Sequence, residues 1–315
     1  MKIYSSIEEF EGASVPVVTT GTFDGVHTGH RQIIGRLKET AARSGGETVL
    51  LTFFPHPRMV LFPERKQVLL NTQEEKTMLL AQAGIDHLIV HPFTREFSML
   101  SSVEFIQDIL VKKIGTKKLV IGHDHHFGRN REGSFEHLRQ YGPVYGFEVE
   151  EIPAHEVEHV NVSSTRIREA LSGGDVSTAN RYLGYKYPLG GTVVKGEQIG
   201  RTLGYPTANI RVDDPFKLTP AEGIYTVSVR HEGKIYGGML SIGVRPTIAE
   251  GLARTIEVNI FNFDKDIYGE HLSVQFIRRL RSELKFEGLE PLKAQMARDK
   301  VDSLNVLKEE RIDTI

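Results

Sequence analysis

The sequence of 315 residues contains no cysteine, which excludes disulfide bonds and thiolate chemistry. No apolar run approaches the roughly 20 residues that a membrane-spanning helix needs, and the first six residues do not resemble a signal peptide. We therefore expect a cytoplasmic protein with no membrane partner. Residues 1–184 hold 20 Lys and Arg against 23 Asp and Glu, and the rest hold 19 against 18. Since neither part is basic, we expect no nucleic-acid partner.

The length favours two domains over one. Strand-like and helix-like segments alternate through residues 1–184, a pattern typical of a parallel sheet with helices on both faces. From residue 185 onward, short β-rich runs and glycine turns indicate a small β-barrel, followed by a helix at about 290–307. We therefore expect an α/β domain over 1–184 and a barrel domain over 185–315. The expected strands are 15–20, 48–54, 87–90, 118–121 and 147–152 in the first domain, and 190–194, 223–229, 234–242, 254–263 and 271–276 in the second.

The segment Gly21–His30, with the sequence GTFDGVHTGH, lies between a predicted strand and a predicted helix. Helix N-termini attract phosphate groups, and His27 and His30 could donate hydrogen bonds to a phosphate as charge moves onto its leaving group. An ordinary glycine-rich turn is the alternative. The sequence has no Gly-x-Gly-x-x-Gly and no Gly-Lys-Ser/Thr, which disfavours a dinucleotide dehydrogenase and a P-loop kinase.

Two further segments follow predicted strands and should lie at the same edge of the sheet. The prolines of Phe53–Pro57 predict a fixed loop rather than the start of a helix. Gly122–Gly128 holds three histidines and Asp124, which allows a metal site, a role for Asp124 in orienting a ribose or a histidine, or a solvated loop. We favour the orienting role over a metal site, because adjacent side chains point in different directions and no distant ligand set completes the usual spacing.

The segment Val162–Leu171 predicts a helix with serine at its start. A serine N-cap accounts for the serine but not for Arg166 and Arg168, because cations in the first turn oppose the helix dipole. A bound polyphosphate would resolve this conflict. We therefore expect the helices after His27 and after Ser163 to hold a nucleotide from two sides.

Gly21–His30 and Val162–Leu171 together resemble the His-x-Gly-His nucleotidyltransferases. Phe54–Pro57 and Gly122–Gly128 narrow the resemblance to the FMN adenylyltransferase domain of prokaryotic FAD synthetases, which implies a Rossmann-like fold. The implied reaction transfers AMP from ATP to FMN, giving FAD and pyrophosphate. The resemblance makes His27 and His30 catalytic, and Phe62 and Arg65 candidates for holding the flavin. The implied ATP- and phosphate-binding residues are Gly21, Phe23, Asp24, Gly29, Asp124, Ser163, Ser164, Thr165, Arg166 and Arg168, with Ser164 and Arg168 on the β- and γ-phosphates. Asn161 replaces an arginine of other members, which leaves the roles of the individual arginines open.

The first barrel motif is the segment 196–209, whose glycines and Arg201 suit a loop folded over phosphates. In an extended chain Thr207 and Asn209 point to one face and offer neutral oxygens to a hard cation such as Mg²⁺. A simple turn is the alternative.

The second barrel motif is the segment 255–261. Strand alternation places Ile256 and Val258 in the core and Glu257 with Asn259 on the opposite face. Glu257 is either a solvated side chain or, opposite a phosphate loop, a base for phosphoryl transfer.

These segments, with 241–247 and 280–286, resemble riboflavin kinase, and nearly the whole chain resembles the bifunctional riboflavin kinase/FAD synthetase family. The resemblance implies that the barrel phosphorylates riboflavin to FMN with ATP. It makes Glu257 the catalytic base, Thr207 and Asn209 the Mg²⁺ ligands, and Arg281 a neighbour of the flavin; Gly196, Gly200 and Arg201 would hold phosphates. Asn259 stands where many relatives have histidine. Mg²⁺ is the expected cofactor, and the expected partners are riboflavin, FMN, FAD, ATP and pyrophosphate, with a monomeric or weakly oligomeric chain.

Two other functions are compatible with parts of the sequence. Aminoacyl-tRNA synthetases also carry His-x-Gly-His, but a basic module for tRNA is missing here. A flavin- or nucleotide-binding regulator on the same scaffold would be expected to lack residues such as His30 and Glu257, which are present.

Overall fold

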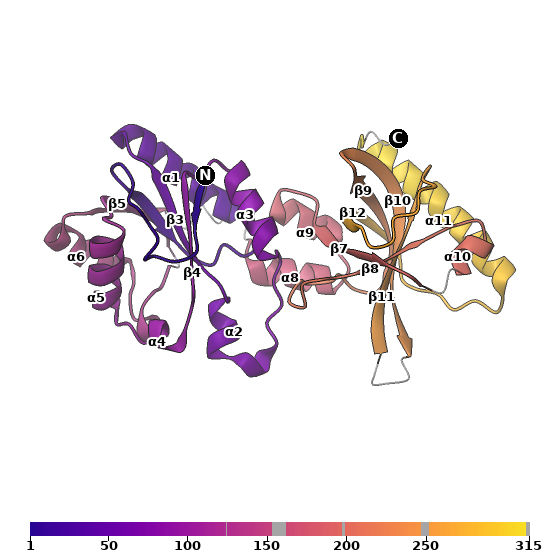
Figure 1. Ribbon diagram of the computed structural model, residues 1–315, viewed down its shortest axis with the longest axis horizontal. Helices are drawn as coiled ribbons and strands as arrows, with labels where there is room; N and C mark the ends of the chain where they lie inside the picture. Colours follow the sequence, from indigo (N-terminus) through magenta and orange to yellow (C-terminus); the bar gives the residue numbers. More distant parts are fainter. Residues whose placement is uncertain (124, 153–161, 197–198, 247–251, 313–315) are drawn as a thin grey trace. The chain divides into compact units, whose positions relative to one another are not determined.

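The computed structural model describes residues 1–123, 125–152, 162–196, 199–246 and 252–312 (Figure 1). The chain divides into two compact units, Met1–Ser164 and Thr165–Ile315. Asp124 and Asn161, named above, lie outside the described residues.

The first unit is built around a six-stranded sheet in the order β1-β4-β3-β2-β5-β6, in which every pairing is parallel. The predicted parallel sheet is therefore confirmed. Its strands are β1 (Lys2–Tyr4), β2 (Val17–Thr20), β3 (Thr48–Phe53), β4 (His87–His91), β5 (Lys118–Gly122) and β6 (Glu148–Ile152). The helices are α1 (Thr28–Ser44), α2 (Pro57–Leu61), α3 (Gln73–Gln82), α4 (Arg95–Ser98), α5 (Ser102–Glu104), the π-helical η2 (Phe105–Lys113), α6 (Phe135–Tyr145), and the 3-10 turns η1 (Pro63–Arg65) and η3 (Arg129–Arg131).

Both faces of this sheet are buried, since consecutive strand residues enter different hydrophobic clusters. Leu50 of β3 packs in a cluster with Ile34 and Leu37 of α1. Its neighbour Leu51 packs in the opposite cluster, with Phe105 of η2. The helices thus cover the two faces and leave the carboxyl ends of the strands as the edge from which the turn at Gly21 emerges.

Two local features of this unit differ from the sequence-based expectation. The loop expected at 53–57 gives way to helix α2, with Pro57 in its first turn and the imidazole of His56 accepting a hydrogen bond from the amide of Arg58 at 3.1 Å. Proline is well tolerated at the first helical position because no hydrogen bond is required of its nitrogen there. The edge strand β1 is also absent from the sequence-based prediction.

The second unit is a closed six-stranded barrel in the order β10-β11-β8-β7-β12-β9. The predicted small barrel is therefore confirmed, although its strand β8 (Ala208–Arg211) is absent from the strands expected from the sequence. Tyr225, Val258 and Phe276 are fully buried. Its elements are α8 (Ser164–Ser172), which begins at the last residue of the first unit, α9 (Val176–Leu183), β7 (Pro188–Val194), α10 (Ile199–Thr202), β8 (Ala208–Arg211), β9 (Gly223–His231), β10 (Lys234–Pro246), β11 (Leu252–Ile260), β12 (His271–Arg281) and α11 (Leu289–Glu309).

Helices on the outside of the barrel are fixed by both polar and apolar contacts. The amide of Asn180 on α9 donates to the carbonyl of Phe276 on β12 at 2.8 Å and accepts from the backbone N–H of Tyr187 at 2.7 Å. Val306 and Leu307 of α11 enter a hydrophobic cluster with barrel residues. The C-terminal helix expected at 290–307 is therefore confirmed, and α9 groups with the barrel unit.

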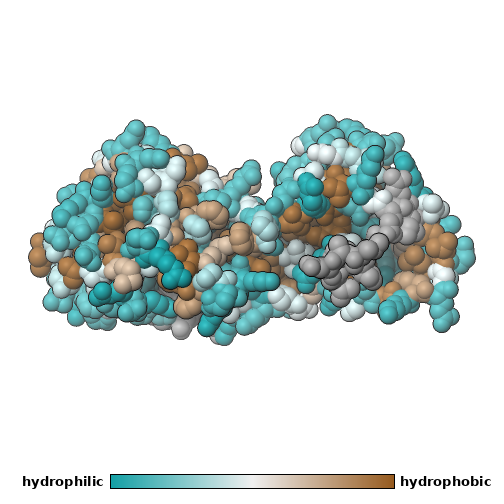
Figure 2. All heavy atoms as spheres, turned by 60° about the horizontal axis from the view of Figure 1, so that its bottom comes forward, coloured by the Kyte–Doolittle hydropathy of each residue, from teal (hydrophilic) through white to brown (hydrophobic). Residues whose placement is uncertain are grey.

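The surface is mixed in character. On the face shown in Figure 2, hydrophobic residues form patches separated by hydrophilic ones. Within the described ranges, no helix is long and apolar enough to cross a membrane.

Candidate active sites in the two units

The turn between β2 and α1 is strained and held by a buried carboxylate. Phe23 and Val26 have positive φ values of 47° and 36°, which side-chain-bearing residues seldom adopt. Oδ1 of Asp24 accepts hydrogen bonds from the backbone N–H groups of Leu70 at 2.9 Å and Asn71 at 3.4 Å. Such strain persists only where surrounding contacts fix it, and it is common at functional sites.

The turn brings the two predicted catalytic histidines into contact. The rings of His27 and His30 stack with centroids 3.6 Å apart, and Nδ1 of His27 accepts a hydrogen bond from the backbone N–H of His30 at 3.3 Å. An accepting Nδ1 places the proton of a neutral His27 on Nε2, which makes Nε2 the donor atom of that ring. Phe23 lies against His30, with ring centroids 4.9 Å apart.

His30 is held in its neutral form. Burial lowers the pKa of His30 well below 6.5, and the nearby His27 and Lys76 lower it further. Its Nδ1 is buried and has no hydrogen-bond partner within the described part of the chain. At neutral pH His30 therefore offers an imidazole N–H group rather than a fixed cation.

Ser164, the last residue of the first unit, contacts this turn. The hydroxyl of Ser164 donates to the backbone carbonyl of Asp24 at 2.9 Å, which links the two segments that the sequence predicts to hold a nucleotide. Ser163 and Thr165 are exposed; Arg166 is exposed and Arg168 half-buried. The first turn of α8 has no acidic residue to offset these arginines.

The two flavin candidates of this unit lie together. Phe62 is 42% exposed, and the guanidinium of Arg65 lies over its ring, 5.0 Å from the centroid. Both follow α2, in the segment that connects β3 to α3.

The barrel unit brings Thr207, Asn209 and Glu257 together. Glu257 on β11 is the register partner of Asn209 on β8. The hydroxyl of Thr207 donates to Oε2 of Glu257 at 3.3 Å. The side-chain amide of Asn259 donates to the carbonyl of Pro206 at 2.7 Å, which fixes the chain just before Thr207. The result is a cluster of one carboxylate, one hydroxyl and one amide.

Glycines allow the preceding loop to approach this cluster closely. A side chain on Gly196 would collide with the amide of Asn209, and one on Gly200 would collide with the carbonyl of Tyr205. Arg201, on α10, is exposed. The loop predicted to fold over phosphates therefore does lie against the predicted metal ligands.

Comparisons with known proteins assign both halves of the chain. A family model described as FAD synthetase matches residues 10–166, and one described as riboflavin kinase matches residues 183–307. The chain is 40% identical over 288 residues to the bifunctional riboflavin kinase/FMN adenylyltransferase of Listeria monocytogenes, covering 91% of each chain. It is 36% identical over 286 residues to that of Escherichia coli K12, covering 90% of each. The chain belongs to the bifunctional riboflavin kinase/FMN adenylyltransferase family.

The chain is therefore an enzyme with riboflavin kinase and FMN adenylyltransferase activities, consistent with FAD synthesis from riboflavin. Both activities imply ATP as co-substrate. A crystal structure described as a macrolide-efflux protein from Streptococcus pneumoniae has the same fold, with a TM-score of 0.89, 33% identity, and coverage of 96% of this chain and 98% of that one. That description concerns the other protein, and for this enzyme the match shows the fold.

Arg281, predicted to lie near the flavin, is bound to the C-terminal helix. Its Nε and one terminal nitrogen donate to the two oxygens of Asp299 on α11, at 2.9 and 2.6 Å. Gln295 donates to the same carboxylate at 2.9 Å. The other terminal nitrogen of Arg281 donates to the carbonyl of Ser282 at 2.9 Å, so most of the guanidinium is held by the protein itself. The sequence offers no signal for the pairing with Asp299.

Sequence reasoning assigns no role to Ser241 and Glu283, although both lie in the quoted kinase motifs. Ser241 of β10 is the register partner of Glu257, and its hydroxyl donates to the carboxylate of Glu283 at 3.1 Å. The carboxylate of Glu283 is therefore hydrogen-bonded to Ser241, which pairs across the sheet with the predicted base Glu257. Lys76 of α3, close to His30, is also missed, because a lysine within a helix matches no motif.

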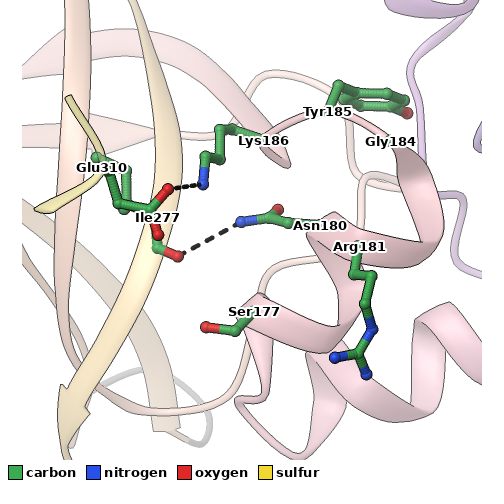
Figure 3. A pocket seen from close by; sticks show the side chains of 8 residues that line it. All are labelled: Ser177, Asn180, Arg181, Gly184, Tyr185, Lys186, Ile277 and Glu310. Atoms are coloured by element: carbon green, nitrogen blue, oxygen red, sulfur yellow. Dashed lines mark hydrogen bonds and ion pairs between the residues drawn. The ribbon is translucent and has the colours of Figure 1, made fainter. Parts of the chain in front are cut away.

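A pocket of about 400 Å³ in the second unit contains none of the predicted site residues (Figure 3). Lys186 and Glu310 pair across it at 2.7 Å. We therefore assign it no ligand. Its lining is Ser177, Asn180, Arg181, Gly184, Tyr185, Lys186, Ile277 and Glu310.

Proposed function

We propose that the two reactions have separate sites: riboflavin is phosphorylated at the barrel cluster, and FMN is adenylylated at the histidine turn. One observation carries this proposal. The stacked pair His27–His30 and the cluster around Glu257 are built in different compact units from different architectures.

In the adenylyl transfer, a phosphate oxygen of FMN attacks the α-phosphorus of ATP, and the bond to pyrophosphate breaks without a covalent protein intermediate. His27 and His30 donate hydrogen bonds to the phosphates and stabilise the charge that develops on the leaving group. Phe62 and Arg65 hold the flavin. The residues proposed to bind ATP are Gly21, Phe23, Asp24, Gly29, Asp124, Ser163, Ser164, Thr165, Arg166 and Arg168, with Ser164 and Arg168 on the β- and γ-phosphates.

In the kinase reaction, Glu257 takes the proton of the riboflavin 5′-hydroxyl as the hydroxyl oxygen attacks the γ-phosphorus of ATP. The bond from the γ-phosphorus to the bridging oxygen breaks, and ADP leaves. Thr207 and Asn209 would hold Mg²⁺, which would neutralise phosphate charge when bound. Their hydroxyl and amide oxygens beside a carboxylate fit a hard cation that retains water ligands. Gly196, Gly200 and Arg201 accommodate the phosphates, and Arg281, oriented by Asp299, lies near the flavin.

The functional boundary is proposed at residues 184/185. The two family matches, 10–166 and 183–307, support it, although α8 and α9 group with the barrel by contact. We also propose a cytoplasmic enzyme that acts as a monomer or weak homo-oligomer without a nucleic-acid or membrane partner.

Two variants test the division of labour in the full chain. With riboflavin, ATP and Mg²⁺, Glu257→Ala should form no FMN, yet it should still convert added FMN to FAD. His30→Ala should accumulate FMN and form little FAD. The flavins are separated by chromatography, and circular dichroism checks folding. Loss of both activities in either folded variant would contradict independent sites.

A further inference from the structure

Lys76 occupies a position in α3 where an apolar side chain would be expected. It lies four residues before Leu80, which is fully buried, so both face the interior of the first unit. Lys76 itself is only 8% exposed. Burying an ammonium is costly unless nearby groups compensate for the lost hydration.

The compensation that the protein supplies is incomplete. Nζ of Lys76 donates to the carbonyl of Thr22 and to the hydroxyl of Thr52, both at the long distance of 3.4 Å, and both acceptors are neutral. The hydroxyl of Thr52 donates in turn to the same Thr22 carbonyl at 3.2 Å. Among the described residues, no carboxylate lies within ion-pair distance of Nζ. The negative charge that acts on the amine from further away is that of Asp24.

These contacts place the amine of Lys76 against the first residues of the histidine turn, Gly21–His30. Thr22 is the second residue of Gly21–His30, and Thr52 is the next-to-last residue of the neighbouring strand β3, near the same edge of the sheet. The charged and titratable groups that act on this region are Asp24 in the turn and His27 and His30 at the start of α1. The carboxylate of Glu75, the neighbour of Lys76 on α3, is occupied in capping that helix at the N–H of Thr72.

We propose that Lys76 is a further positioning residue of the adenylyltransferase site: its buried ammonium holds the Thr22 end of the histidine turn and adds positive charge behind the phosphates bound there. This proposal rests on the assignment of His27 and His30 to that site. Thr22 and Thr52 are neutral, whereas bound phosphate groups are negatively charged. The substrate therefore offsets the free-energy cost of burying the ammonium of Lys76.

The protonation behaviour of the amine provides the readout. Burial lowers the pKa of Lys76 from 10.5 to about 8, and Asp24 partly counteracts this effect. The free enzyme therefore loses the charge as pH rises above about 8. Bound phosphates raise the pKa of the amine, so kcat/KM for ATP should fall near pH 8, whereas kcat should fall only at higher pH.

The experiment measures FAD formation from added FMN and ATP between pH 6 and 10, using the full chain. Lys76→Met should lower kcat/KM by roughly tenfold to a hundredfold at pH 7, because a charge interaction in a desolvated site is lost. The fall near pH 8 should disappear in this variant. Lys76→Arg, which stays charged, should recover activity and show no fall below pH 10. Formation of FMN from riboflavin, measured on the same samples, should stay within about twofold.

Two controls separate the possible failures. Lys112→Met removes an exposed lysine that pairs with Asp108 at 2.7 Å, and it should leave both activities unchanged. His30→Ala tests the site itself: if it retains FAD formation, the site assignment fails, whatever Lys76→Met does.

With His30→Ala inactive, the proposal for Lys76 is overturned if Lys76→Met keeps wild-type kcat/KM. It is also overturned if the variant loses activity but keeps the fall near pH 8, since the lysine would then matter only for folding. If Lys76→Met does not fold, Lys76→Arg decides: a profile that moves to higher pH supports the proposal, and an unmoved profile overturns it.

Discussion

Removing the Asp24 carboxylate should destabilise the first unit at the histidine turn while sparing the barrel. In Asp24→Ala the N–H groups of Leu70 and Asn71 lose their shared acceptor in a buried environment. An unpaired buried amide costs about 1–3 kcal/mol, and the 3.4 Å bond to Asn71 is the weaker of the two. The loss is therefore about 2–4 kcal/mol in the unfolding free energy of the first unit. For a unit of this size that corresponds to roughly 4–16 °C in its melting temperature.

The assay follows both activities after heating the same sample of full-length enzyme. FAD formation from added FMN should be lost at a lower temperature in Asp24→Ala, whereas FMN formation from riboflavin should be lost at the wild-type temperature. Asp24→Asn is the matched control, because it keeps a side-chain oxygen for the two amides and should retain at least half of the lost stability. An unchanged inactivation temperature for FAD formation, or an equal drop for both activities, would refute the reasoning.

Three further outcomes are expected. Gly196→Ala should reduce FMN formation and raise the Mg²⁺ concentration required, because a Cβ there collides with Asn209; a variant with wild-type Mg²⁺ dependence would contradict this contact. Burial lowers the pKa of His91 below its usual 6.5, so the unfolded chain binds a proton at a higher pH than the folded chain does. The unfolding free energy should therefore fall as pH drops below 6.5. His91→Asn should weaken this fall, as measured by urea titrations at pH 7.5 and 5.5. Asp299→Asn should raise the KM for riboflavin by loosening Arg281, without affecting FAD formation from added FMN, and an unchanged KM would argue against a flavin role for that arginine.

Much of the architecture follows from patterns within short segments. The alternation of strand-like and helix-like segments predicts the parallel sheet, and the closely spaced strands after residue 185 predict the barrel. Both patterns are visible in the sequence because they reflect which side chains each element must bury. The clustering of Thr207 with Asn209 also follows locally, since strand residues two apart share a face. Strand β1 and helix α2 are exceptions. For α2, proline suits both a loop and a first helical turn, and the sequence of 53–57 does not separate them.

The sequence by itself determined most of the elements, the two motifs that mark the reactions, and the family, all of which depend on residue types at fixed short spacings. Only the tertiary structure decided which groups complete those motifs. Asp24 meets the amide of Leu70 across 46 residues, Arg281 meets Asp299 on another element, and Lys76 lies behind the histidine turn. Such pairings depend on strand register and on which face of a helix is buried, and these are set by packing of the whole unit rather than by any one segment.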